Sequence, residues 1–273
     1  MKWDRYGLTD SQWKIANYVQ KHLQQVLLST EKEIAQEIGV SIATVSRFWQ
    51  AIGYQNLKEF KKEMKDNWEV SPAGKMKNVS KQLSSKSMYV TIEKSLGLLQ
   101  ETLEHLDENE FLQAIDLLHK AKSIHILALG PSKGLGELLT YRIARFGKHI
   151  QTFQKQGHEL FEEMIHLTEK DVLIIFAFGR LLPEAKVLLS YQRQKHYHSI
   201  LITDQLVADF SSFSTITLYA SRGEANEFHS MIAPTLLIEN LILKLGMKEE
   251  EKNIERLETL SRLRKQFSEE LPR

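Results

Sequence analysis

The sequence EKEIAQEIGVSIATVSRFWQ at residues 31–50 specifies the fold of the first part of the chain. It predicts two short helices, Glu31–Ile38 and Ile42–Ile52, separated by Gly39, which tolerates the positive φ of a tight turn. Ala35 is small where the two helices would cross. The apolar residues that would hold the helices together are Ile34, Ile38, Val40, Val45 and Phe48. The pattern predicts a helix-turn-helix unit, with an ordinary helical hairpin as the alternative.

The second of these helices carries the predicted DNA contacts, because a helix-turn-helix unit inserts the N-terminal end of that helix into the major groove. Arg47 is the candidate for a guanine or phosphate contact. Thr30 and Glu33 have the spacing of a capping box, and Thr30 with the backbone at that helix start is a candidate phosphate contact. The small or polar residues that permit a close approach to the bases are Ser41, Ala43, Thr44, Ser46 and Arg47. We therefore expect a double-stranded DNA operator as a partner.

Positive and negative charges are nearly balanced over the whole chain. The chain has 273 residues and a formal net charge of +1, so a DNA-binding surface must be local. Four lysines follow the predicted unit, and they either contact phosphates or form a solvated face. They are Lys58, Lys61, Lys62 and Lys65.

Composition excludes several classes of protein. The hydrophobic fraction of 42% is enough for folded cores, and the absence of cysteine excludes disulfides, thiolate metal sites and cysteine nucleophiles. Met1–Asp10 is polar and charged, unlike a secretory signal. The longest apolar runs, such as Val172–Phe178, are too short to span a bilayer. We expect a cytoplasmic protein with no membrane partner.

The chain changes character after a Ser- and Lys-rich region. Helical patterns throughout the start predict an all-α helix-turn-helix domain at 1–76, then a linker and connecting helix at 77–106. Residues 107–250 alternate short apolar runs with helical stretches, and 251–273 read as a charged amphipathic helix. The candidate strands are Ser123–Leu129, His149–Phe153, Val172–Phe178, Ser199–Thr203 and Thr215–Leu218. This alternation predicts an α/β domain, a doubly wound five-stranded parallel sheet flanked by helices, the last of them at Glu227–Leu245.

Residues 33–60 carry a family resemblance. The segment VSIATVSRF, followed by IGYQNLKEFK, resembles the N-terminal domain of the RpiR (MurR/RpiR) family of transcriptional regulators. That family pairs this domain with a C-terminal sugar isomerase (SIS) domain, a five-stranded parallel sheet flanked by helices. The alternation at residues 107–245 is similar to such a domain, so the resemblance covers nearly the whole chain and implies a SIS-like second domain.

Ligands of open parallel sheets bind outside the carboxyl ends of the strands. The first such end is followed by Gly130, Ser132 and Lys133, where Gly130 permits a sharp turn and Ser132 offers a hydroxyl and N–H groups to an anion. The resemblance implies that this loop contacts phosphorylated sugars and that Ser132 is its serine; the alternative is that Ser132 only caps the next helix. The loop is neither a Walker A nor a G-x-G-x-x-G sequence, so we expect no nucleotide cofactor.

The next strand end departs from the family pattern. SIS domains that hold sugar phosphates commonly have a Ser-x-Ser-Gly-x-Thr loop here, and this chain has Ala177–Leu182 instead. Arg180 in that loop either binds a phosphate or carboxylate or makes a surface salt bridge. Further candidate ligand contacts are Thr203, Glu227 and Ser230, and the last two equally suit a helix cap. The expected effector is a small metabolite such as a sugar phosphate or a related carbohydrate derivative.

Neither a catalytic nor a metal constellation is recognisable in the sequence. The segment starting at His158 reads His-Glu-x-x-Glu, which is not the zinc motif His-Glu-x-x-His. We therefore expect a ligand-responsive regulator rather than an enzyme, with association into a homodimer or homotetramer. The alternatives are a sugar-phosphate isomerase with an accessory DNA domain, and a regulator whose SIS-like domain is only a dimerisation scaffold.

Overall fold

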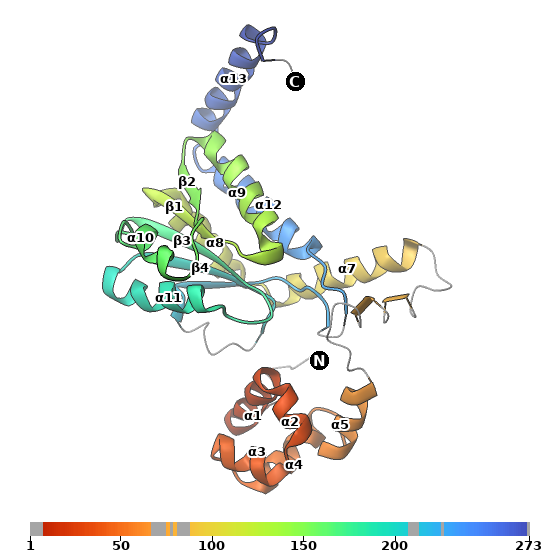
Figure 1. The fold of residues 1–273 in the computed structure, drawn as a ribbon. Coiled ribbons are helices and arrows are strands. Elements are labelled where there is room, and N and C mark those ends of the chain that lie inside the picture. The colour runs from red at the N-terminus through yellow and green to blue at the C-terminus, as the bar shows by residue number, and fades with distance from the viewer. Residues whose placement is uncertain are drawn as a thin grey trace. The chain divides into compact units, whose positions relative to one another are not determined.

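The described part of the chain comprises residues 8–66, 75–76, 79–80, 88–206, 213–224 and 227–271 of the computed structural model. The chain divides into two compact units (Figure 1). The first unit contains Met1–Val90, Leu206–Asp209 and Gly223–His229. The second unit contains Thr91–Gln205, Phe210–Arg222 and Ser230–Arg273.

The first unit is helical, as the sequence predicts. Its main helices are α1 (Asp10–Lys21), α2 (Leu23–Leu28), α3 (Glu31–Ile38), α4 (Ile42–Ala51) and α5 (Leu57–Asp66). Gly39 lies between α3 and α4 in the left-handed conformation, at φ 73°, because the turn requires a positive φ that glycine adopts without steric cost. The side chains at the centre of the unit are fully buried, among them Ile15, Val19, Ile34, Val45, Phe48, Trp49 and Phe60.

Side-chain caps define where two of these helices begin. Thr9 and Gln12 form a capping box at α1, and Thr30 and Glu33 form the predicted one at α3. In each box the threonine hydroxyl accepts a backbone N–H of the first turn, and the other side chain accepts the threonine N–H. Donors that would otherwise lack partners are thereby satisfied.

The second unit is built on a five-stranded sheet with the order β2-β1-β3-β4-β5, and every neighbouring pair is parallel. The strands are β1 (Ser123–Leu127), β2 (His149–Thr152), β3 (Asp171–Ala177), β4 (His198–Thr203) and β5 (Ile216–Tyr219). All seven residues of β3 are buried. This central strand is covered on both faces, which explains its nearly continuous apolar sequence.

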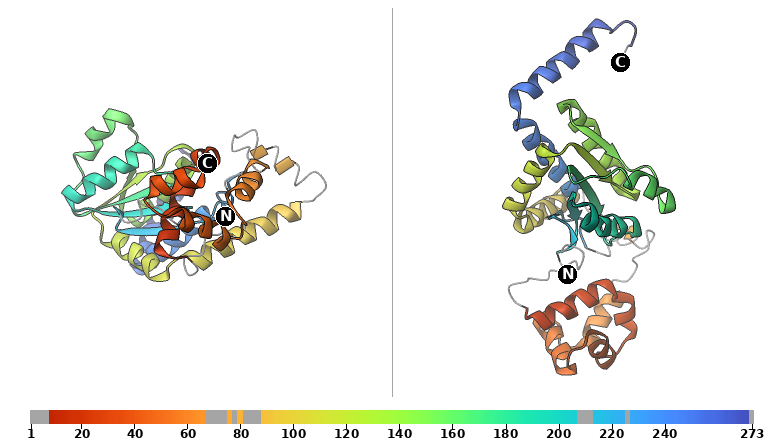
Figure 2. Two further views of the ribbon diagram at one scale, coloured as in Figure 1. Left: turned by 90° about the horizontal axis from the view of Figure 1, so that it is seen from below. Right: turned by 90° about the vertical axis from the view of Figure 1, so that its left-hand side faces the viewer.

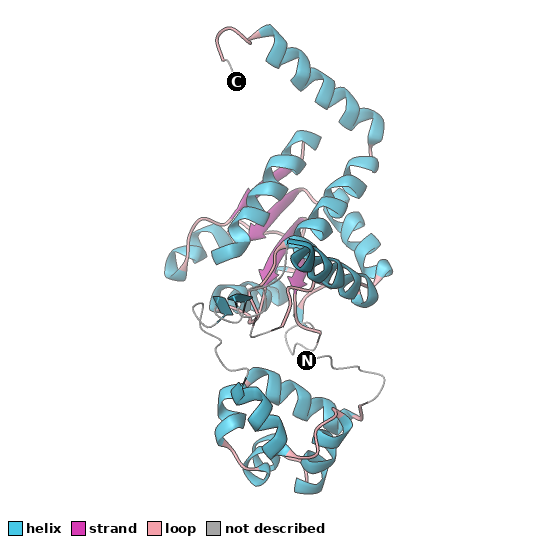
Figure 3. Cartoon of the chain, turned by 90° about the vertical axis from the view of Figure 1, so that its right-hand side faces the viewer, coloured by secondary structure: helices cyan, strands magenta, loops and turns pink. Residues whose placement is uncertain are grey.

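Helices cover both faces of the sheet (Figure 2, Figure 3). On one face α8 (Glu108–Lys120), α9 (Lys133–Ile143) and α12 (Ile232–Met247) share a core with alternate strand residues such as Ile124 and Ile126. The other face carries α10 (Leu160–Met164) and α11 (Pro183–Lys195) (Figure 1). The predicted doubly wound fold is confirmed.

The start of the long helix corrects the sequence-based prediction. The pattern places a helix at Glu227–Leu245, but α12 begins at Ile232. Pro234 explains the difference, because a proline is tolerated only in the first turn, where its missing N–H would lack an intrahelical partner anyway. A helix from Glu227 would place Pro234 in its interior.

The remaining helices flank this domain in the sequence. α7 (Met88–His105) precedes α8, and α13 (Glu250–Gln266) follows α12. The apolar residues Ile254, Leu257 and Leu263 of α13 are exposed. Most of the predicted linker after Asp66 lies outside the described residues. Among the described residues, no helix combines the length and apolarity that a bilayer span requires.

Close packing of α9 on the end of β1 leads to a stability prediction. A Cβ on Gly136 would lie 2.8 Å from the Cβ of Ala128, whereas a Cβ on Gly134 would meet nothing within 4 Å. We expect Gly136→Ala to lower the free energy of unfolding of the second unit by ~1–3 kcal/mol because of overpacking. Gly134→Ala, the matched control, should be neutral or stabilising by up to ~1 kcal/mol. Urea unfolding followed by circular dichroism measures both, and equal stability of the two variants would contradict the packing.

Candidate functional site

One face of α4 does not pack against the core of the first unit and is exposed. Val45, Phe48 and Trp49 are fully buried, whereas Ala43, Arg47 and other residues are exposed. The spacing i, i+4, i+7 puts Ala43, Arg47 and the exposed Gln50 on one side of the helix. We call the residues Ala43, Ser46, Arg47 and Gln50 the α4 face. Sequence reasoning missed Gln50, although its helical spacing from Ala43 and Arg47 was a usable signal.

The start of α4 is capped by its own hydroxyls. The Oγ of Ser41 accepts the N–H of Thr44 at 3.1 Å, and the two hydroxyls lie 2.8 Å apart. The Nε of Arg47 donates to the carbonyl of Ala43 at 3.2 Å. The Nη groups of Arg47 have no hydrogen-bond partner within the described part of the chain. Arg47 is thus held along the helix with donors left for a ligand.

Thr30 is engaged within its own capping box. Its N–H donates to Oε2 of Glu33 at 2.6 Å, and its hydroxyl accepts the N–H of Glu33 at 3.3 Å. Two hydrogen bonds to the Glu33 carboxylate lower its pKa: the larger effect comes from the N–H of Thr30, and the smaller from the Thr30 hydroxyl, which donates to Oε2 at 2.9 Å. A charged carboxylate therefore occupies the start of α3. The phosphate contact of Thr30 stays a prediction, and it would require Glu33 to move aside.

The lysines of α5 have different environments. Lys61 is half-buried, and its Nζ donates to the carbonyl of Ser29 at 2.6 Å, so it joins α5 to the turn before α3. Lys58 and Lys62 are exposed, which leaves them available for phosphate contacts. The side chain of Lys65 lies outside the described residues.

In the second unit, the strand order reverses between β1 and β3, and ligands of such sheets bind at the carboxyl ends flanking this point. After β1, Gly130 adopts φ 57° and begins a short 3-10 turn that continues into α9. Ser132 therefore has helical dihedral angles, φ −76° and ψ −9°, and its side chain does not cap α9. The alternative that Ser132 serves as a helix cap is wrong for this reason. Its side chain is buried, and Lys133 beside it is exposed.

The loop after β3 is bound by the residues that follow β4. The N–H of Gly179 donates to Oδ1 of Asp204 at 2.7 Å, and the side chain of Gln205 donates to the carbonyl of Gly179. Both backbone groups of Gly179 are therefore occupied. Arg180 is exposed and makes neither a hydrogen bond nor an ion pair with any described residue.

A buried ion pair lies at the same edge of the sheet. Arg222, three residues after β5, is 8% exposed, and its Nη1 lies 3.4 Å from Oδ2 of Asp204. Its guanidinium also lies over the ring of Phe178, 4.6 Å from the centroid. Burial lowers the pKa of Arg222, and Asp204 opposes that shift. Sequence reasoning did not single out Arg222, because burial of an arginine is a tertiary property.

The other predicted ligand contacts lie in varied surroundings. Thr203 is fully buried, and its hydroxyl donates to the carbonyl of Ala177 at 2.8 Å, so this hydroxyl joins β4 to β3 instead of facing a ligand. Ser230 precedes Met231, the N-cap residue of α12, and its hydroxyl accepts the N–H of Ile232 at 3.2 Å, the first N–H of that helix. Glu227 belongs to the segment that groups with the first unit, and its carboxylate accepts the N–H of Glu224.

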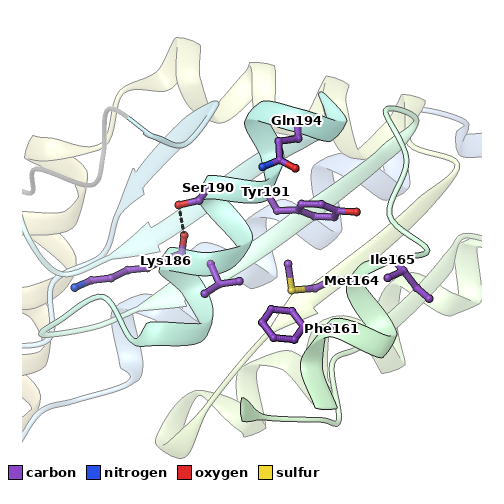
Figure 4. A pocket seen from close by; sticks show the side chains of 8 residues that line it. Phe161, Met164, Ile165, Lys186, Ser190, Tyr191 and Gln194 are labelled. Carbon is purple, nitrogen blue, oxygen red and sulfur yellow. Dashed lines mark hydrogen bonds between the residues drawn. The ribbon is translucent and has the colours of Figure 1, made fainter. Parts of the chain in front are cut away.

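An apolar hollow of about 440 Å³ lies between α10 and α11 (Figure 4). Phe161 and Met164 approach it from α10, and Tyr191 approaches from α11. None of the predicted ligand contacts lines it. Within the described residues, no group of three or more His, Asp or Glu side chains is arranged to hold a metal ion.

Two family models match the chain. Residues 2–71 match the helix-turn-helix domain of the rpiR family, and residues 117–244 match the SIS domain. An uncharacterized HTH-type transcriptional regulator of Haemophilus influenzae is 23% identical over 225 residues, which are 78% of this chain and 75% of that protein.

Solved structures share the fold. The sugar isomerase domain of an RpiR transcription factor from Sphaerobacter thermophilus matches with a TM-score of 0.60 at 16% identity, covering 65% of this chain and 99% of that one. The Vibrio vulnificus NanR protein complexed with ManNAc-6P matches with a TM-score of 0.60 at 20% identity, covering 94% of this chain and 93% of that one.

The capping box of α3 gives a testable stability effect. Thr30→Ala should lower the free energy of unfolding of the first unit by about 1 kcal/mol. Thr9→Ala, which breaks the equivalent box of α1, is the control and should cost a similar amount. Fluorescence during urea unfolding monitors this unit, because Trp49 is buried in its core and residues 91–273 contain no tryptophan.

Acid should reduce this effect. Because the folded-state pKa of Glu33 is lowered, its stabilising contribution is present above its unfolded pKa and is lost as the pH falls through the folded value. The difference in stability between Thr30→Ala and the wild type should therefore shrink below about pH 4. A difference that does not change with pH would show that the Glu33 carboxylate takes no part in the cap.

Proposed function

We propose that the chain is a transcriptional regulator of the rpiR family that senses a small metabolite, because residues 2–71 match the helix-turn-helix domain of that family and residues 117–244 match the SIS domain. The first unit binds an operator in duplex DNA. The second unit binds the metabolite at the carboxyl edge of its sheet. A protein with this activity acts in the cytoplasm, where it meets both DNA and metabolites.

The α4 face is the observation that carries the DNA-binding role. Small side chains at Ala43 and Ser46 allow the helix backbone to approach base edges in the major groove. Arg47 keeps its Nη donors for a guanine or a phosphate, and Gln50 adds an amide that suits adenine. The exposed Lys58 and Lys62 supply charge for the phosphate backbone.

We propose that the regulator works as a homodimer or homotetramer. Two α4 helices related by a two-fold axis would bind half-sites about one helical turn of DNA apart, or a multiple of it. Exposed apolar residues on α12 and α13 are available for association, among them Leu236, Leu243, Met247, Ile254 and Leu257. Effector binding then changes DNA affinity if two arrangements of the α4 helices bind the effector with different affinities.

The proposed effector is a sugar phosphate or a related anionic carbohydrate derivative. Support comes from the buried Ser132 hydroxyl, which does not cap α9, and from the cations Lys133 and Arg180 at the same strand ends. The structure of the NanR protein, which has a similar fold, is of its complex with ManNAc-6P. Ala177–Leu182 lacks the hydroxyls of the usual phosphosugar loop, so the contacts of this effector differ from the family pattern.

A second candidate is a regulator whose SIS-like domain serves only as a scaffold. It is favoured by the engaged backbone of Gly179, where the side chains of Asp204 and Gln205 already occupy both hydrogen-bonding groups. A sugar-phosphate isomerase is the remaining alternative, and turnover of phosphosugars by the purified chain would support it.

Replacing Arg47 tests the DNA-binding role. Arg47→Ala should weaken operator binding by roughly 10- to 100-fold, equivalent to ~1–3 kcal/mol, because a base or phosphate contact is lost. Fluorescence anisotropy with a duplex selected by gel shift from genomic fragments measures this affinity. Lys58→Ala is the control, and it should weaken all duplexes equally and reduce the salt dependence by about one phosphate. Binding by Arg47→Ala as tight as wild type would show that the α4 face is not the DNA contact.

A ligand panel tests the sensing role. A sugar phosphate that binds should raise the melting temperature of the chain and change its operator affinity by about 5- to 150-fold. Ser132→Ala and Arg180→Ala should each reduce the thermal shift, because each removes a proposed contact. A panel of sugar phosphates and amino sugars without any shift would favour the scaffold instead.

A further inference from the structure

Arg222 is a buried cation that has more N–H donors than hydrogen-bond acceptors around it. It follows β5 at the carboxyl edge of the sheet and is 8% exposed. Burying a guanidinium is costly unless its N–H groups are paired. Its Nε is completely covered and has no hydrogen-bond partner among the residues that the structure describes. The single hydrogen bond of the guanidinium to the described residues comes from Nη1.

The partner of that hydrogen bond is shared. Oδ2 of Asp204 lies 3.4 Å from Nη1, long for a charge-assisted contact, while Oδ1 accepts the N–H of Gly179 at 2.7 Å. Asp204 is therefore bound more closely to the loop after β3 than to Arg222. Because Asp204 uses Nη1, the edge of the guanidinium formed by Nε and Nη2 remains for another acceptor.

The position of this free edge fits a ligand rather than a structural acceptor. Arg222, Gly179 and Ser132 follow three strands of one parallel sheet at their carboxyl ends, where such sheets bind ligands. The ring of Phe178 lies 4.6 Å from the guanidinium and holds it flat on one side. A planar guanidinium with an unused edge binds a carboxylate or a phosphate through two parallel hydrogen bonds.

We propose that Arg222 is a further anion-binding residue of the second unit and donates hydrogen bonds to a phosphate or carboxylate group of the ligand, with Asp204 as its internal competitor. Asp204 holds the guanidinium in place when no ligand is bound, and its own negative charge opposes the incoming anion. Since Nε is covered, the anion reaches it only when the covering side chains shift. The inference rests on the proposed function only in treating that ligand as the effector.

Direct binding to the full chain tests this assignment. The probes are glucose 6-phosphate, gluconate and glucose, which offer a phosphate, a carboxylate and no anion, at constant ionic strength. Isothermal titration and thermal shift should give saturable binding of at least one anionic probe and none of glucose. Arg222→Gln should weaken that binding by about 10-fold or more. The preferred probe identifies the anion as phosphate or carboxylate.

Two further variants separate binding from folding. Arg193→Gln is the matched control, because Arg193 is exposed and lies over the ring of Phe213 at 4.7 Å, and it should bind the probe like wild type. Asp204→Asn should tighten binding several-fold, since it removes the competing charge while its amide oxygen still accepts the N–H of Gly179. A misfolded variant would not gain affinity.

Three outcomes would overturn the assignment. They are equal affinity of Arg222→Gln and wild type, weaker binding by Asp204→Asn, and no saturable binding of either anionic probe. Operator affinity measured in parallel distinguishes this inference from the proposed function. If an anion binds through Arg222 without changing operator affinity, the proposed sensing function is contradicted and the Arg222 assignment stands. A change in operator affinity that persists in Arg222→Gln contradicts the Arg222 assignment alone.

Discussion

Burial of the parallel sheet on both faces is the constraint on which the second unit depends. Parallel strands need long crossover connections, and the helices in those connections cover the sheet. β3 is buried along its whole length, and helices pack on either side of it. Neither face can then hold a polar ligand. Polar side chains are therefore found in the loops after β1, β3, β4 and β5, at the carboxyl ends of the strands. This explains why one edge of the sheet carries Ser132, Gly179, Asp204 and Arg222.

The polar groups at that edge differ in how they are satisfied. The hydroxyl of Thr203 is hydrogen-bonded within the sheet. The backbone N–H and carbonyl of Gly179 are hydrogen-bonded to the side chains of Asp204 and Gln205. The guanidinium of Arg222 makes one hydrogen bond, from Nη1, to the described residues, so its Nε and Nη2 donors have no acceptor among them. At this edge the loop after β3 is already hydrogen-bonded, whereas Arg222 still has donors without acceptors. A ligand anion would therefore bind near Arg222 and not at the loop that usually supplies hydroxyls. In the first unit, helix caps and an apolar core provide the stability, and the α4 face stays exposed and available for a ligand.

Much of this architecture could be predicted from the sequence, because its signals are local. The glycine turn, the capping box at Thr30 and the apolar spacing of residues 31–50 define the helix-turn-helix, and continuous apolar runs define the strands. The features that were missed have two kinds of cause, local element boundaries and tertiary burial. The short helix α2 has too few residues for a clear period, and the start of α12 is set by Pro234. Arg222 could be recognised only once its burial beside Asp204 and Phe178 was known.

A crystal structure of the chain with the anionic probe that binds most tightly tests the central claim directly, namely that ligands bind at the carboxyl edge of the sheet. The account predicts the anion at the ends of β1, β3 and β5, with hydrogen bonds from Arg222 and a contact to Ser132. A probe seated instead in the apolar hollow between α10 and α11, with the pairing of Arg222 and Asp204 unchanged, would contradict it.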